Sequence, residues 1–210
     1  MAQFSNYVID KFIAPNASSF TQAEIPDMSA YDKESSHWVA NFFLNSVLRA
    51  AWKPPYNAYM YNYLRRAEAA FREHHAARTE TLAFIESGRQ STKRYTAALF
   101  HWEGFLGQSW HAYKTLQKCF EVELYKQGEG SVEERLNALY NQMKHVESRI
   151  ENKQILEGAT VPVWLTNQGL VSVDSALTFS ETGEVLKELA KWANILQDPL
   201  SAPEKLKQHA

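Results

Sequence analysis

A short run near residue 140 carries side chains that could act on a phosphodiester. Asn141, His145 and Arg149 follow one another at steps of four residues, so on one continuous helix they stack along a single face. A histidine titrates near neutral pH, and an amide and a guanidinium beside it suit an orienting group and a phosphate clamp. His145 is therefore a candidate general acid/base. The simpler interpretation of the same residues is a solvated helix face.

A second polar group interrupts an apolar stripe further upstream. His74 and Arg78 occupy positions that the same helical spacing otherwise gives to Phe71 and Leu82. A buried arginine needs a carboxylate partner, because an unpaired buried charge is very costly. Glu103, near the apolar stripe of the following helix, is the nearest acidic candidate by angular position. We predict a structural pair between Arg78 and Glu103.

The sequence lacks the residues that disulfide, metal, nucleotide and serine-nucleophile sites need. The single cysteine, Cys119, excludes a disulfide framework and a cysteine-rich zinc site. Glu34 and His37 have the spacing of a di-iron ligand pair, but there is no second such pair. No Walker loop and no Gly-x-Ser-x-Gly elbow occurs. The sequence thus predicts neither a metal nor another cofactor.

Composition and charge place the chain among ordinary globular proteins. Its 210 residues are 45% hydrophobic and fit one domain over residues 1–210. A net charge of −2 gives no global attraction for nucleic acid, so any RNA would need a local patch. We expect no membrane association and a cytoplasmic location, because no apolar run is long enough for a bilayer and cysteine is scarce.

The elements that must position these residues are helical. Apolar residues recur at spacings of three and four in four segments. They are residues 57–86, 93–120, a segment that starts at the Ser131 cap and runs to about 152, and 182–196. Two β-rich strings between Val161 and Asp174 predict a hairpin. The fold class is all-α, an antiparallel helical bundle with a core of about residues 31–155 and an accessory hairpin and terminal helix over about 156–200.

One further helix precedes the double proline at Pro54 and Pro55. Its apolar residues, in "HWVANFFLNSVL", point in nearly all directions around a helix. Such a distribution predicts a central, buried helix.

The string "LYNQMKH", Leu139 to His145, resembles the signature of the HEPN superfamily. In that signature the final long helix carries an arginine, a polar residue such as asparagine, and a histidine about one turn later. Asn141 and His145 occupy the asparagine and histidine positions. The arginine would fall at residues 138–140, where Ala138, Leu139 and Tyr140 stand.

The resemblance implies a fold and an activity. HEPN-like domains are helical bundles that commonly form homodimers with their signature helices facing each other. Many are metal-independent ribonucleases of toxin–antitoxin or phage-defence systems, in which a ribose 2′-hydroxyl attacks the adjacent phosphate. By this resemblance His145 is the general acid/base and Asn141 holds the imidazole or the phosphate. Lys144 and Arg149 contact RNA phosphates, and an antitoxin or defence protein is an expected partner.

Two other functions remain open from the sequence. The absent arginine favours an inert helical module for dimerisation and protein interaction. Aromatic residues at helical spacing would also suit a sensor that binds a small molecule in an aromatic-lined pocket; they are Trp102, Trp110, Tyr113 and Trp164.

Overall fold

The computed structural model describes residues 6–155 and 159–202, and most of these residues are helical. The ends of the predicted domain and its predicted internal boundary at residue 156 lie outside these ranges. The helices are α1 (Asn6–Phe12), α2 (Asp32–Ser35), α3 (Trp38–Leu48), α4 (Tyr56–Glu86), α5 (Thr92–Phe120), α6 (Val132–Lys144), α7 (Val146–Glu151) and α8 (Phe179–Leu196). The strands are β1 (Trp164–Leu165), β2 (Gly169–Val171) and β3 (Ala176–Thr178), and two short 3₁₀ turns cover Ala17–Ser19 and Ser29–Tyr31.

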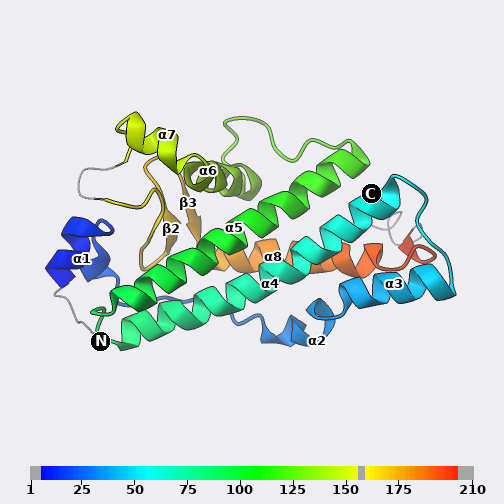
Figure 1. Ribbon diagram of the computed structural model, residues 1–210, viewed down its shortest axis with the longest axis horizontal. Coiled ribbons are helices and arrows are strands. Elements are labelled where there is room, and N and C mark those ends of the chain that lie inside the picture. The colour runs from blue at the N-terminus through cyan, green and yellow to red at the C-terminus, as the bar shows by residue number, and fades with distance from the viewer. Residues whose placement is uncertain (1–5, 156–158, 203–210) are drawn as a thin grey trace.

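Helices α4 and α5 form a long antiparallel pair that runs the length of the molecule (Figure 1). The turn between them begins at Gly88, whose φ of 69° is the left-handed conformation that ends many helices. The amide of Gly88 donates to the carbonyl of Ile85 at 3.0 Å. The bounds of both helices agree with the predicted segments within one residue.

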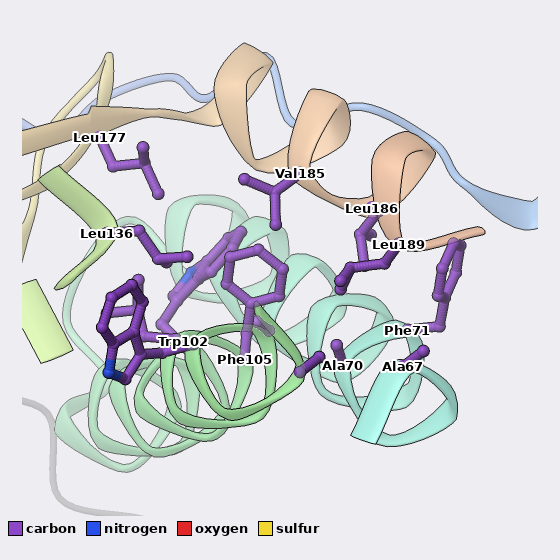
Figure 2. Packing of buried hydrophobic residues seen from close by; sticks show 14 of the residues in the cluster. Ala67, Ala70, Phe71, Trp102, Phe105, Leu136, Leu177, Val185, Leu186 and Leu189 are labelled. Carbon is purple, nitrogen blue, oxygen red and sulfur yellow. The ribbon is translucent and has the colours of Figure 1, made fainter. Parts of the chain in front are cut away.

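The core lies where α8 crosses this pair, as Figure 2 shows from close by. Small residues of α4, Ala67 and Ala70, let the apolar face of α8 approach closely, and Trp102 and Phe105 of α5 fill the space beside them. All four of these residues are fully buried. Helix α6 and strand β3 complete the core with Leu136 and Leu177.

Four buried aromatic side chains have polar atoms that are bonded across elements, which removes the cost of burying those atoms. The bonds run from Trp102 Nε1 to Thr81 Oγ1 at 3.0 Å, from the Tyr63 hydroxyl to the Leu189 carbonyl at 2.8 Å, from the Leu165 amide to the Tyr95 hydroxyl at 3.2 Å, and from Trp38 Nε1 to Asn194 Oδ1 at 2.8 Å. These bonds fix α3 and α4 to α8, and α5 to α4 and β1.

The sheet has one strand more than the sequence predicted. Its three strands are antiparallel in the order β1-β2-β3, with Leu170 opposite Leu177. Strand β3 was missed because only Leu177 among its three residues is buried, which is too short a pattern to show a period. Thr178 ends this strand and begins α8 through a capping box with Glu181.

Helix α3 differs from its prediction. Only Trp38 and Phe42 of this helix are buried, and α3 lies at the edge of the molecule (Figure 1). Its other large apolar residues, Phe43, Leu44, Val47 and Leu48, are between 52% and 80% exposed. The prediction of a central, buried helix was wrong because α4 and α8 cover one face of the helix and the other face is exposed in the described part of the chain.

Candidate functional site

The predicted site face lies where α6 ends and α7 begins. His145 is the residue between the two helices, with φ −114° and ψ 31°. Backbone bonds still join it to its neighbours one turn away: its amide donates to the Asn141 carbonyl at 3.2 Å, and its carbonyl accepts from the Arg149 amide at 3.0 Å. The continuous helix that the sequence predicted is therefore broken at the candidate general acid/base.

The side chains of this face engage other residues. Asn141 Nδ2 donates to Asn137 Oδ1 at 3.1 Å, and Arg149 Nη1 donates to Gln154 Oε1 at 2.9 Å. His145 and Lys144 are exposed. Among the described residues no side-chain hydrogen bond joins Asn141, His145 and Arg149 to one another, so the structure does not assemble them into a catalytic group.

A cleft on the open end of the α4–α5 pair gathers positive charge. It encloses about 350 Å³. We call it the cationic cleft; its lining is Ala58, Tyr59, Asn62, Arg65, Arg66, His111, Lys114, Thr115 and Lys118. Four of these residues are cations and none is a carboxylate. A concave site with such a lining suits phosphate groups.

Among the described residues no carboxylate forms an ion pair with the two arginines of the cationic cleft. Arg65 Nε donates to Asn62 Oδ1 at 2.9 Å, and Arg66 Nη1 donates to Gln108 Oε1 at 2.7 Å. Both partners are neutral amides, which orient a guanidinium without neutralising it. Partial burial and the charge of Arg65 lower the pKa of Arg66. A bound anion would relieve this repulsion.

His111 stands at the edge of the cationic cleft that faces α6. Its Nε2 lies 3.1 Å from the hydroxyl of Tyr140. The pKa of His111 is lowered from its usual value of 6.5 by partial burial and by the charges of Arg66 and Lys144. A lowered pKa keeps the ring neutral at pH 7, as a proton acceptor requires. Lys144, predicted from sequence as a phosphate contact, thus lies within electrostatic reach of the cleft.

The predicted pair between Arg78 and Glu103 was wrong. Arg78 Nη2 lies 3.7 Å from Asp27 Oδ2, and its Nε donates to the Ile25 carbonyl at 3.2 Å. The arginine side chain is 31% exposed, and burial raises the pKa of Glu103. Arg78 found a partner on the segment before α2, which has no helical period from which its position could be predicted.

Other candidate residues belong to the core. Trp102, Trp110, Tyr113 and Trp164 are all buried in the hydrophobic cluster, and Trp110 also lines a cleft. Cys119 is buried, and burial raises the pKa of its thiol to about 11, which disfavours a reactive thiolate.

Residues 6–155 and 159–202 contain neither a cluster of metal ligands nor a helix that could span a membrane. No three histidine, cysteine, aspartate or glutamate side chains in these ranges gather as metal ligands. The helices of the described chain also include none with the length and apolar content that crossing a bilayer takes.

Sequence reasoning missed five residues of the cleft, Arg65, Arg66, His111, Lys114 and Lys118. The signal was present in the helix pair itself. Arg65 and His111 lie 23 residues before and after Gly88, so an antiparallel fold about that glycine brings them opposite each other. Pairing each basic residue of one helix with the residue at the same distance from Gly88 on the other helix would have located the cleft.

Comparison of the chain with protein-family models, with curated proteins and with solved structures finds no match.

Proposed function

We propose that the protein binds RNA and that the cationic cleft holds the RNA phosphates. The observation that carries the proposal is a lining with Arg65, Arg66, Lys114 and Lys118 and no carboxylate. Phosphate contacts from such side chains supply most of the affinity of proteins for nucleic acid. The choice of RNA among polyanions rests on the resemblance of residues 139–145 to the HEPN signature.

Metal-independent cleavage is the second part of this proposal. In that reaction the ribose 2′-hydroxyl loses its proton to a general base, and its oxygen attacks the adjacent phosphorus. The 5′ oxygen leaves and takes up a proton, which gives a cyclic phosphate end. His111, kept neutral beside the cleft, and His145, the signature histidine, are the two candidate bases. A toxin or defence role, with an antitoxin or defence partner protein, rests on the resemblance alone.

Binding is tested with a fluorescent RNA oligonucleotide. We expect Arg65→Gln and Lys118→Gln each to weaken binding several-fold, because each removes one phosphate contact. Arg72→Gln is the matched control, since Arg72 is an exposed arginine of α4 that does not line the cleft. Equal losses in all three variants, or no RNA binding by the unaltered protein, would contradict the proposal.

Cleavage is tested by incubating the protein with mixed RNA in EDTA. The proposal expects cyclic-phosphate products that disappear in His111→Ala or in His145→Ala. The variant that keeps RNA affinity but loses cleavage identifies the base. Binding without cleavage in the unaltered protein removes the enzymatic part and leaves RNA binding standing.

A second candidate function is the inert interaction module, and the uncovered face of α3 favours it. Phe43, Leu44 and Val47 share this face with Leu48, and α3 contains no charged residue. We infer that its occupant is a second copy of the chain, because an uncharged apolar face is complementary to itself across a two-fold axis.

The basic residue that follows α3 argues against a lipid surface in that place. Arg49 is paired with Asp198 at 2.7 Å, so the positive charge beside this face is balanced by a carboxylate. Light scattering after size-exclusion chromatography should give a dimer that Val47→Glu and Leu48→Glu convert to a monomer. The dimer that the HEPN resemblance implies would instead be broken by charge changes at Lys144 and Arg149. A monomeric unaltered protein contradicts both arrangements.

A further inference from the structure

A second cleft adjoins the cationic cleft and shares Lys114 with it. It encloses about 460 Å³ and is lined by Trp110, Lys114, Gln117, Glu123, Leu124, Tyr125, Gln127 and Asn137. We call it the amide cleft, after its three side-chain amides. Its lining combines aromatic rings, three amides and one carboxylate, whereas the residues that line the cationic cleft include no carboxylate and one amide, Asn62.

Hydrogen bonds hold the back of the amide cleft in one arrangement. Asn137 Nδ2 donates to the Tyr125 hydroxyl at 2.5 Å, and Asn137 Oδ1 accepts from Asn141 Nδ2 at 3.1 Å. The rings of Tyr125 and Trp110 lie 6.3 Å apart between centroids. The signature residue Asn141 thus acts, in this structure, as a support for Asn137 and through it for Tyr125.

Polar side chains at the rim of the amide cleft could bond to a ligand. Within the described part of the chain, the side chains of Glu123 and Gln127 make no hydrogen bond, and Glu123 is exposed. Lys114 donates to Gln117 and lies 5.6 Å from the centre of the Trp110 ring, so its ammonium is held between the two clefts.

We propose that the amide cleft receives one unpaired nucleobase of the RNA whose phosphate lies at Lys114. The proposal rests on the proposed RNA binding and adds to it the state of the RNA. Proteins read single-stranded RNA by stacking splayed bases on aromatic rings and by bonding their edges to amides and carboxylates. An amide pairs with the donor and acceptor edge of a base, and a carboxylate accepts from an exocyclic amino group.

The shared lysine is the reason for assigning both clefts to one ligand. A nucleotide carries its base and its phosphate on one sugar, so a base site and a phosphate site must be neighbours. In a duplex the base edge is already paired and stacked, so it cannot enter the amide cleft. The arrangement therefore selects single-stranded RNA.

The experiment measures fluorescence anisotropy with four probes at one salt concentration. They are a single-stranded RNA oligonucleotide, the same oligonucleotide with abasic positions, a blunt RNA duplex and inorganic polyphosphate. The unaltered protein should bind the base-bearing strand about tenfold more tightly than the abasic strand or the duplex, the contribution of one stacked base. Tyr125→Leu should abolish this difference and leave abasic and polyphosphate affinities unchanged.

Two further variants keep the test decisive. Tyr61→Leu removes a partly exposed tyrosine that packs against Phe43, outside both clefts, and should leave all four affinities unaltered. Gln127→Ala changes an exposed rim residue and should weaken base-bearing RNA alone, even if Tyr125→Leu fails to fold. Equal affinity of the unaltered protein for base-bearing and abasic strands overturns the base site but not phosphate binding. Failure to bind any of the four probes overturns both.

Discussion

At the residue scale, His74 is a buried histidine whose surroundings oppose its charge. It is 1% exposed, and its Nε2 lies 3.2 Å from Thr182 Oγ1. Burial, with smaller effects of Arg78 and His75, lowers the pKa of His74 from 6.5 to about 4. The folded protein therefore holds this ring neutral at a pH where the unfolded chain protonates it.

The consequence is a loss of stability in mild acid. The contribution of His74 is fully present above pH 6.5 and is lost as the pH falls from 6.5 toward 4. We expect the free energy of unfolding to drop by about 2 kcal/mol between pH 7.5 and pH 5 on this account. Urea denaturation at both pH values measures it. His74→Gln should flatten the dependence, and an unchanged slope in that variant would show that other groups cause it.

Single residues also show which contacts could be predicted from the sequence and which could not. The helical period placed His74 on a buried stripe, and it is buried, because position on a helix follows from spacing alone. The same period placed Arg78 near the core but assigned it to Glu103, whereas its partner, Asp27, comes from a segment without period. A contact between a helix and an irregular segment depends on a chain path that periodicity does not describe. His111 and its cleft were missed for a related reason, since they need two helices laid side by side.

At the element scale, the small sheet depends on one glycine. A Cβ atom at Gly169 would lie 2.0 Å from the carbonyl oxygen of Leu177, which is backbone of the paired strand and has no room to move. Gly169→Ala should therefore lower the free energy of unfolding by roughly 3 kcal/mol, at the upper end of overpacking costs. Thermal or urea denaturation measures the change.

Gly107→Ala supplies the matched control in a helix. A Cβ atom there would meet Tyr140 at 3.8 Å, an ordinary contact. Alanine favours a helix interior over glycine by about 1 kcal/mol, so this variant should be as stable as the unaltered protein or more so. If both alanine variants lose stability alike, the close approach of β2 and β3 is not the cause.

Helix α8 is anchored to α6 by a two-pronged ion pair. The guanidinium of Arg135 donates to both carboxylate oxygens of Glu181, with one bond of 3.0 Å, and also to the Ala176 carbonyl. Arg135 lowers the pKa of Glu181, whose carboxylate also accepts from Thr178 in the capping box. Arg135→Ala should cost about 1–2 kcal/mol, because the pair is only partly screened from water. A double-mutant cycle with Glu181→Ala measures the coupling, and additive losses would contradict it.

Some helices and strands could likewise be predicted from the sequence, and others could not. The long helices α4, α5 and α8 carry many turns of consistent spacing, so their extents could be predicted within a few residues. Helix α3 has the composition of a buried helix, yet one face is uncovered, because burial depends on the neighbours as well as on the helix. Strand β3 depends on pairing with β2, which a pattern of three residues does not show.

At the scale of the whole molecule, the net charge of −2 and the cationic cleft lead to opposite expectations for RNA. A net negative protein repels RNA at long range, but salt screens that repulsion beyond about 10 Å at 0.1 M. Phosphates seated in the cleft meet Arg65, Arg66, Lys114 and Lys118 at contact distance and release their counterions. Local charge should therefore dominate over net charge.

Measuring RNA affinity at several salt concentrations separates the effect of the net charge from that of the cationic cleft. For four phosphate contacts on a single strand, the logarithm of the association constant should fall with the logarithm of salt concentration at a slope of about −3. Lys118→Gln should make this slope shallower by about 0.7, the share of one contact. Substituting an exposed cation outside the cleft, as in Arg72→Gln, alters net charge by the same amount and should leave the slope unchanged. A slope that follows net charge in both variants would place the RNA on the general surface of the protein instead of in the cleft between α4 and α5.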